Sequence, residues 1–392
     1  MHYLSQTFHL LALLLTTHRS RPADVLLIGA GFAISAAALT FMLSIPAGMD
    51  RIAGRTGQDD IILALSSSAQ DEVGSSLSPS QISLISTLSA IQRDRTGAPM
   101  VAPQFLATAR LTRDDGSKTS ALVRGVSPAT WRLLGGTQTQ GVQTPVAGSR
   151  KLLAGRSLMK QISSLQGESI EFRGSDWYLA GPLDSNGSLW ESELWADISD
   201  LQAAYANSGR VSSLWLKLHS AGDFSALQKA VAADARLDGI RLIAQTDYYR
   251  QQLGFITSYV TNAAVGISIL LGIGAVLAVS TTLGMALERQ QRETATLMAI
   301  GFHRASICGS LLLDILFIGA ITTAATVLMV YLGLDGRSFG TSSANQAVYA
   351  NFVVDLAVAI PVAGYNFALC ILSCAGPLRA IVTSPPSRQL TA

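Results

Sequence analysis

The chain has 392 residues, of which 49% are hydrophobic and only 14% are charged, and its net charge is +2. Soluble domains carry a charge on about a quarter of their residues, so a purely water-soluble protein is excluded. The near-neutral balance also argues against nucleic-acid binding, which needs a basic face. Of the 28 Lys and Arg residues, 20 lie between Met49 and Arg250, and so do 20 of the 26 Asp and Glu residues. This block alone has the composition of a soluble domain.

The rest of the chain is typical of a membrane protein. Residues 1–22 are predicted to form an interfacial helix that lies on the inner leaflet. A spanning helix needs about 20 mostly apolar residues. The segments that meet this requirement are 23–48, 251–287, 305–334 and 350–378. Each is expected to be helical, because unpaired backbone groups cannot face lipid, and Pro46 is expected to close the first.

The cations in short loops and at the termini predict the orientation. They precede the first span, lie between the second and third spans, and follow the fourth span. The positive-inside rule therefore places both termini, including the tail 379–392, and the segment 288–304 in the cytoplasm. The block 49–250 and the loop 335–349 are then expected outside the cytoplasm.

The block 49–250 is long enough for a core of its own, and its pattern predicts a mixed α+β domain. The predicted strands are Asp60–Ser66, Phe105–Thr112, Ser120–Val126, Ser169–Phe172, Trp177–Ala180, Ser213–Leu218 and Ile240–Ala244. The predicted helices are Pro79–Ile91, Arg156–Leu165 and Asp223–Ala235. A further helix is expected from near Asp247 to about Glu288, which would make a stalk roughly 60 Å long.

Motifs for chemistry are weak in this chain. None of the five Lys residues follows a Gly, so there is no P-loop and ATP would have to bind to another chain. Ser157-Leu-Met-Lys160 matches the Ser-x-x-Lys of acyl enzymes, but its Lys-Thr-Gly companion is missing, which favours a chance match. Glu191, Glu193 and Asp197 are interpreted as a solvated acidic loop in preference to a carboxylate pair or a cation site.

Two features of the predicted spans have alternative readings. Asp314 lies about ten residues into the third span, where a carboxylate is costly and should face other helices or water. A structural or conformational role is favoured over a proton relay. Cys370 and Cys374 share a helix face, and packing is favoured over a metal site because no His or carboxylate accompanies them. The sequence therefore predicts no metal site and no catalytic residue.

The segment after the second span has the most specific pattern, which comprises Glu288, Arg289, Arg292, Glu293, Leu297, Ile300 and Gly301. It resembles the Glu-Arg-x-x-Glu-Ile-x-x-Leu-Arg-Ala-Leu-Gly signature of the FtsX/MacB-type ABC transporter permeases of the type VII superfamily. That family also has the layout predicted here, which is one span, then a large external domain, then three more spans. Looser matches to the family are Leu153–Lys160, Gly167–Ile170, Trp177–Gly181 and the tail from Pro377 to Pro385. Asp314 falls where the family usually has a Glu.

The resemblance implies a dimeric permease of the bacterial inner membrane, without a cofactor of its own, that works with a cytoplasmic ATPase dimer holding ATP and Mg. The segment 288–304 would be a coupling helix in a groove of the ATPase. Arg289 and Arg292 would pair with ATPase carboxylates, and Leu297 and Ile300 would supply the apolar anchor.

In this interpretation the stalk passes ATP-driven movement to the external domain, a rigid-body switch that drives export or extraction of a lipoprotein, lipid or peptide. A periplasmic adaptor is a possible further partner. Two alternatives stay open. One is an FtsX-like regulator that activates an external partner such as a cell-wall hydrolase and transports nothing. The other is a membrane-tethered external enzyme.

Overall fold

The structure is a computed structural model that describes residues 22–383 apart from 113–115, 117, 136–143, 161–168, 290–295, 297, 299, 301 and 343–346. The chain divides into two compact units. We call Met1–Ala47, Ile256–Arg337 and Phe352–Ala392 the membrane unit, and Gly48–Phe255 together with Ser338–Asn351 the globular unit. The interfacial helix predicted ahead of the first span lies outside the described residues.

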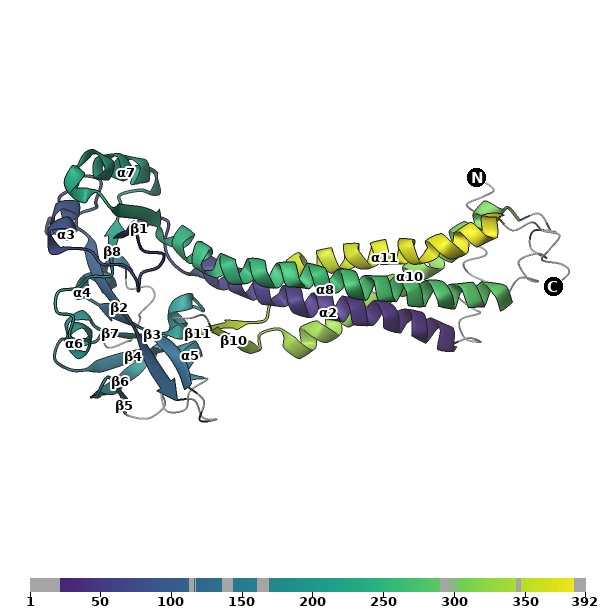
Figure 1. The fold of residues 1–392 in the computed structure, drawn as a ribbon, viewed down its shortest axis with the longest axis horizontal. Helices are drawn as coiled ribbons and strands as arrows, with labels where there is room; N and C mark the ends of the chain where they lie inside the picture. Colours follow the sequence, from purple (N-terminus) through teal and green to yellow (C-terminus); the bar gives the residue numbers. More distant parts are fainter. Residues whose placement is uncertain are drawn as a thin grey trace. The chain divides into compact units, whose positions relative to one another are not determined.

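Four long helices run through the membrane unit, and Figure 1 shows them side by side. They are α2 (Pro22–Arg55), α8 (Gln245–Arg289), α10 (Arg304–Leu334) and α11 (Leu356–Thr383). Each is long and apolar enough to cross a membrane. The predicted class is therefore confirmed in the described part of the chain: four candidate membrane-spanning helices, with a large mixed α/β domain after the first of them.

Two predicted span boundaries are wrong. The helix α2 continues through Pro46 to Arg55, because proline removes only one backbone donor and the turns after it are held by burial of Met49, Ile52 and Ala53. The fourth span begins at Leu356 instead of Ala350, because the preceding residues belong to a β-hairpin.

A tyrosine ties three of the membrane helices together. The Tyr365 hydroxyl on α11 donates to the carbonyl of Ser268 on α8 (2.6 Å) and lies 2.7 Å from the Ser35 hydroxyl on α2. Gly272 makes room for this contact, since a Cβ there would lie 2.7 Å from the Tyr365 hydroxyl oxygen. Gly274, two residues on, would meet nothing within 4 Å. Within this chain, Gly272 of these two α8 glycines is the one that allows close approach to a neighbouring helix.

Replacing Gly272 with alanine is expected to destabilise the membrane unit by about 1–3 kcal/mol, because the added methyl displaces Tyr365 from both of its partners. Gly274→Ala is the matched control and should be neutral or slightly stabilising, since alanine is the better helix former. All three cysteines lie on α10 and α11, so thermal unfolding followed with a thiol-reactive dye reports on this unit. Equal melting temperatures for the two variants would contradict the proposed contact.

A nine-stranded sheet forms the centre of the globular unit, in the order β5-β6-β4-β7-β3-β2-β8-β1-β9 (Figure 1). The strands are β1 (Ile61–Ser66), β2 (Val101–Thr112), β3 (Lys118–Val126), β4 (Lys151–Gly155), β5 (Ser169–Phe172), β6 (Ser175–Leu183), β7 (Glu193–Asp197), β8 (Ser213–Lys217) and β9 (Ile240–Ala244). The long strand β2 joins two halves of the sheet, because its first residues pair with β8 and its later residues pair with β3. The pairs β3–β7 and β4–β6 are parallel, and the others are antiparallel.

Short helices cover the two halves of the sheet over separate cores. They are α3 (Pro79–Ser86), α4 (Pro128–Leu133), α5 (Arg156–Met159), α6 (Ile198–Ala204) and α7 (Phe224–Ala233), with the 3-10 turns η3 (Leu189–Ser192), η4 (Ala221–Asp223) and η5 (Ala235–Leu237). One core includes Phe105, Trp177 and Leu194, and the other includes Leu216 and Leu227. The strands β7, β3 and β2 therefore lie in the middle of the sheet.

Elements with a local sequence signal were predicted well. The capping box that starts α3 pairs Ser78 with Gln81, and the β5–β6 hairpin turns through Arg173 and Gly174, both at positive φ. The strands β4, β7, β10 and β11 and the helices α4 and α6 were missed. The helix predicted over Arg156–Leu165 is described only as α5, because 161–168 lie outside the described residues.

The stretch predicted as the loop 335–349 carries a hairpin of the globular unit. Its strands are β10 (Ser338–Ser342) and β11 (Ala347–Asn351). The Tyr349 amide donates to the Ser192 hydroxyl (3.0 Å), and the Tyr349 side chain packs into the core. Gly48 of α2 lies so close that a Cβ there would overlap the Asn351 carbonyl oxygen. A segment from between the third and fourth spans thus completes the globular core.

Candidate functional site

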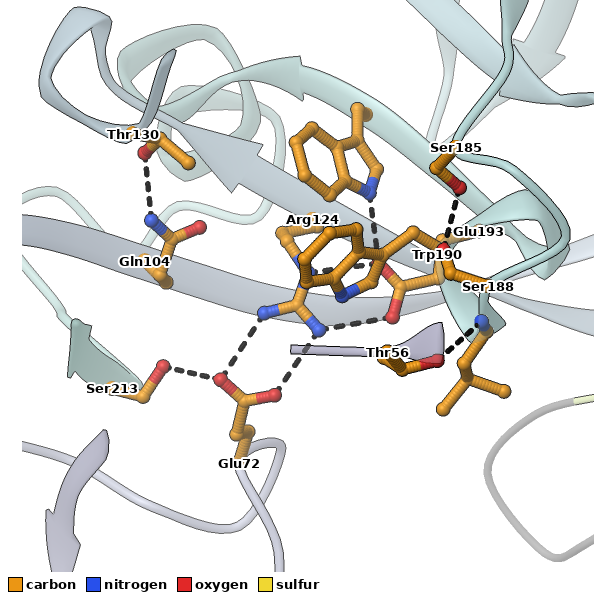
Figure 2. A network of polar contacts seen from close by, with 12 residues as sticks. Thr56, Glu72, Gln104, Arg124, Thr130, Ser185, Ser188, Trp190, Glu193 and Ser213 are labelled. Carbon is orange, nitrogen blue, oxygen red and sulfur yellow. Dashed lines mark hydrogen bonds and ion pairs between the residues drawn. The ribbon is translucent and has the colours of Figure 1, made fainter. Parts of the chain in front are cut away.

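A buried cluster of charged residues occupies the middle of the globular unit (Figure 2). Arg124 on β3 makes two forked ion pairs. Its Nε and Nη2 donate to the carboxylate of Glu193 on β7 at 2.8 and 2.9 Å. Its Nη1 and Nη2 donate to the carboxylate of Glu72 at 3.1 Å each. The exposed fractions of Arg124, Glu72 and Glu193 are 0%, 2% and 1%, so these charges are inaccessible to a substrate in solution.

Indole and hydroxyl groups complete the hydrogen bonding of this cluster. The Trp195 Nε1 donates to Glu193 (2.8 Å), and the Ser213 hydroxyl donates to Glu72. The guanidinium of Arg124 also lies over the Trp215 ring, 5.3 Å from its centroid. Nearly every polar atom of the three charged groups therefore has a partner, as buried charge requires.

The first turns of α8 are built into the same cluster. The Tyr249 hydroxyl accepts from the Trp190 Nε1 (3.0 Å) and from the Arg124 Nη2 (3.4 Å). The Tyr248 hydroxyl accepts from the backbone amide of Glu72 (3.0 Å). We call Arg124, Glu72, Glu193, Trp190, Tyr248 and Tyr249 the stalk anchor, because they join the sheet to the beginning of α8.

Residues just after α2 hold the same end of α8. The backbone N–H of Gln58 donates to the side-chain oxygen of Gln245 (3.0 Å), and the Thr246 hydroxyl donates to the Asp59 carboxylate (2.8 Å). Gly57 has a φ of +89°, which places the backbone in close contact with Gln245. The start of α8 is therefore fixed by contacts from several separate segments of the globular unit.

The electrostatics of the anchor favour a permanently charged arginine. Burial lowers the pKa of the Arg124 guanidinium, but the nearby carboxylates of Glu193 and Glu72 outweigh this effect and hold its pKa well above its usual value. The arrangement can hold two strands, a loop and a helix in one geometry.

The structure corrects the interpretation of the acidic residues around Trp190. Glu191, Glu193 and Asp197 are all buried. The Glu191 carboxylate accepts from the backbone amides of Ser185 (3.1 Å) and Gly187 (2.7 Å) and from the Ser157 hydroxyl (3.1 Å). These hydrogen bonds replace those that the buried Glu191 carboxylate would otherwise make with water. The positions of the three acidic residues along the chain give no indication of such partners.

Asp197 and the Ser-x-x-Lys match have structural explanations. Asp197 is the N-cap of α6, and its carboxylate accepts from the Ser199 amide at 2.9 Å. Ser157 at the start of α5 uses its hydroxyl to bind Glu191, and Lys160 follows the last turn of α5. This placement agrees with a chance match of the motif.

Replacing Tyr249 with phenylalanine is expected to destabilise the globular unit by about 1–3 kcal/mol, because the buried Trp190 N–H loses its acceptor and Arg124 loses one contact. Urea unfolding followed by tryptophan fluorescence measures this effect, since all five Trp residues belong to this unit. Tyr259→Phe, at an α8 position that is 72% exposed, is the control and should change little. Equal stability of the two variants would contradict the role of the Tyr249 hydroxyl.

Only part of the predicted coupling segment is described. Glu288 and Arg289 are exposed at the end of α8, and Ile300 is 72% exposed. The Ile300 amide donates to the Thr296 carbonyl (3.0 Å), which is the i to i−4 bond of an α-helix. The other predicted residues, Arg292, Glu293, Leu297 and Gly301, lie outside the described residues, so their role stays a prediction.

The carboxylate predicted in the third span is buried. Asp314 on α10 is 7% exposed in the membrane unit. Another buried polar side chain, Asn366 on α11, was missed, and it donates to the Thr323 hydroxyl at 2.8 Å. The sequence signal for Asn366 was an uncharged polar residue within an apolar run. Such residues usually bond across helices, and the role of Asp314 stays a prediction.

Comparison with known proteins identifies the C-terminal part of the chain. Residues 265–386 match the sequence family described as FtsX-like permease C-terminal. This region resembles an FtsX-like permease domain, and we call it the FtsX-like region. It contains most of α8, all of α10 and α11, and the segment with the predicted ATPase contacts. No curated protein sequence matches the chain significantly.

Solved structures similar to this chain include external domains of two transporters, among 26 matching chains. One is the extracellular domain of the noncanonic ABC-type transporter YknZ from Gram-positive bacteria, with 10% identity and a TM-score of 0.35 over 47% of this chain and 99% of that chain. Another is the periplasmic region of MacB from Actinobacillus actinomycetemcomitans, with 15% identity and a TM-score of 0.34 over 51% of this chain and 95% of that chain.

The FtsX-like region begins within α8, after the stalk anchor. The helix itself starts at Gln245, in the globular unit, and continues without a break to Arg289. Forty-five helical residues correspond to about 67 Å, roughly twice the hydrocarbon thickness of a bilayer. The long helix predicted from near Asp247 to about Glu288 is therefore confirmed as one helix, and it contributes residues to both the FtsX-like region and the globular unit.

Proposed function

We propose that this chain is the permease subunit of an ABC system in which a separate cytoplasmic ATPase moves the globular unit through α8. The observation that carries the proposal is the combination of the FtsX-like region with a single helix that leaves this region and ends in the stalk anchor. A helix fixed at one end by buried ion pairs and hydrogen bonds transmits displacement as a rigid body.

The cytoplasmic end of the system is the segment 288–304. Glu288, Arg289 and Ile300 are exposed, as a surface that binds another protein requires. In the proposal Arg289 and Arg292 pair with carboxylates of the ATPase, and Ile300 and Leu297 fill an apolar pocket. The distribution of Arg in short loops supports a cytoplasmic location for this segment and both termini, with the globular unit on the other side.

The exposed face of α8 supports a dimer of permease subunits. Apolar side chains with large exposed fractions follow one another along it, and they are Val265, Ile269, Leu270, Ile273 and Leu277. Gly266 and Gly274 would accept a Cβ without meeting any atom within 4 Å. Small residues between apolar ones let two membrane helices approach closely. In the proposal, ATP binding draws two copies of α8 together and hydrolysis releases them.

The proposed outcome is export or extraction of a lipoprotein, lipid or peptide at the external face of the membrane. An FtsX-like regulator would use the same ATPase contact and the same stalk. The two functions differ in what stimulates ATP hydrolysis by the complex: a lipidated or peptide substrate in the first case, and a cell-wall hydrolase or similar external protein in the second.

Purification of the tagged chain from its native membranes, followed by an ATPase assay on the eluate, tests the proposal. A separate ATPase should co-purify with the wild-type chain and be lost from Glu293→Ala/Leu297→Ala. Thr296→Ala, an exposed position in the same segment, is the matched control and should retain the ATPase. Absence of an ATPase from the wild-type eluate under gentle conditions would overturn the proposal.

A further inference from the structure

An apolar groove runs between α10 and α11 on the surface of the membrane unit. Its volume is about 650 Å³. The residues that line it from α10 are Leu316, Gly319, Ala320, Thr323, Ala324, Val327, Leu328 and Tyr331, and those from the α11 side are Val354, Asp355, Leu356, Ala359, Ala363, Phe367 and Cys370. The groove has room because both of its walls carry small side chains: Ala320 and Ala324 on α10, and Ala359 and Ala363 on α11. A groove in this position is bathed by lipid chains.

The floor of the groove offers almost no free polar group. Thr323 is 7% exposed, and its hydroxyl donates to the Gly319 carbonyl and accepts from the Asn366 amide. Cys370 fills the space over Gly319, where a Cβ would overlap its sulfur. An apolar cavity with satisfied walls does not hold water. If the groove were empty, the side chains that line it would lack dispersion contacts along its whole length.

The dimensions of the groove select its occupant. Leu316 and Tyr331 mark its ends on α10, and fifteen helical steps between them correspond to about 22 Å. This length equals one leaflet of a bilayer with its headgroup layer, about 20–22 Å. The groove is therefore as long as one lipid molecule of a single leaflet, from its headgroup to the end of its acyl chain.

The two ends of the groove differ in polarity. Tyr331 and Asp355 lie at the end where α10 stops and α11 begins, and Leu316 and Cys370 lie at the other end, within the span. Tyrosine is enriched at headgroup level, where its ring meets the chains and its hydroxyl meets water. This polarity fixes the direction of an amphiphile, with its head beside Tyr331 and its tail toward Leu316.

We propose that this groove binds one fatty acyl chain of a membrane phospholipid, with the headgroup at the Tyr331 end. The site is independent of the ATPase and of the direction of transport. It lies within a single unit of the chain and needs no second subunit.

Photo-crosslinking in nanodiscs tests the proposal. The full chain is reconstituted with a phospholipid that carries a diazirine on its acyl chain, irradiated, and mapped by mass spectrometry. Cross-links are expected to concentrate on the groove residues of α10 and α11. Ala324→Trp, which fills the groove from α10, should reduce them by about fivefold or more, because the indole occupies the volume of the chain.

Matched controls separate loss of the site from general perturbation. Ala325→Trp introduces the same side chain at the next α10 position, which is exposed and outside the groove lining, and should leave the cross-links within about twofold. On α11, Ala363→Trp should block labelling as Ala324→Trp does, and exposed Ala368→Trp should not. Equal labelling of the groove and the exposed face of α8, or equal effects within both pairs, would overturn the proposal.

Discussion

Replacing Arg124 with methionine is expected to lower the free energy of unfolding of the globular unit by about 3–5 kcal/mol. The substitution leaves the carboxylates of Glu72 and Glu193 buried without their cation, while Met keeps a similar volume against the Trp215 ring. Chemical unfolding of the full chain in nanodiscs, followed by tryptophan fluorescence, measures the change. The signal belongs to this unit, because all five Trp residues lie in it.

Two further variants show whether the loss comes from unpaired charge. Arg110→Met, at an exposed position of the adjacent strand β2, should change stability by no more than about 0.5 kcal/mol. Replacing Arg124, Glu72 and Glu193 together with apolar residues of similar size should recover much of the loss, because no buried charge then lacks a partner. An Arg124→Met variant as stable as the Arg110 control would contradict the stalk anchor.

Replacing Gly48 with alanine is expected to destabilise the globular unit by about 2–3 kcal/mol, because the new methyl overlaps the backbone carbonyl of Asn351. A backbone atom cannot rotate away, so β11 itself must move from its place in the core. Gly54→Ala, on the same helix, would meet nothing within 4 Å and should be neutral or stabilising.

The same fluorescence-detected unfolding compares the two glycine variants. A Gly48→Ala protein that unfolds at the same denaturant concentration as Gly54→Ala would show that the hairpin of β10 and β11 does not pack against the end of α2. Loss of stability confined to Gly48→Ala would tie the segment between the third and fourth spans to the globular core.

Local patterns in the sequence predicted most of the architecture. Apolar runs of sufficient length indicated the four spans, and alternation or capping residues indicated β1, β8 and α3, because these signals need only neighbouring residues. The helix α8 was predicted to run from the external domain through the membrane because no proline or charged cluster interrupts it before Glu288.

The features that the sequence did not predict depend on contacts between residues that lie far apart in the chain. The sequence predicted a solvated Glu193, because no neighbouring residue in the chain indicates that Arg124, 69 residues away, is its ion-pair partner. The strands β10 and β11 were missed because their burial depends on Ser192 and the end of α2. For the candidate site, the sequence located Asp314 inside the membrane unit, whereas Asn366 was missed although it is a polar residue within an apolar run. Nothing in the sequence indicated the Tyr249 contact.

The most direct test of force transmission by α8 is to measure whether ATP changes the position of the globular unit. A spin label at exposed Lys229→Cys, in a variant without the three native cysteines, gives the distance between two copies in the complex with its ATPase. A Cβ at Gly254 on α8 would meet no atom within 4 Å, so alanine is tolerated there. Proline at this position removes a backbone hydrogen bond and clashes with the carbonyl four residues earlier, which kinks or breaks the helix.

We expect ATP to change the distance between the labels by about 5 Å or more in the wild type and in Gly254→Ala. The Gly254→Pro complex should still hydrolyse ATP but show no such change, because the helix no longer transmits the displacement. A wild-type complex that hydrolyses ATP at a constant label distance, or a Gly254→Pro complex that moves as the alanine variant does, would contradict force transmission through α8.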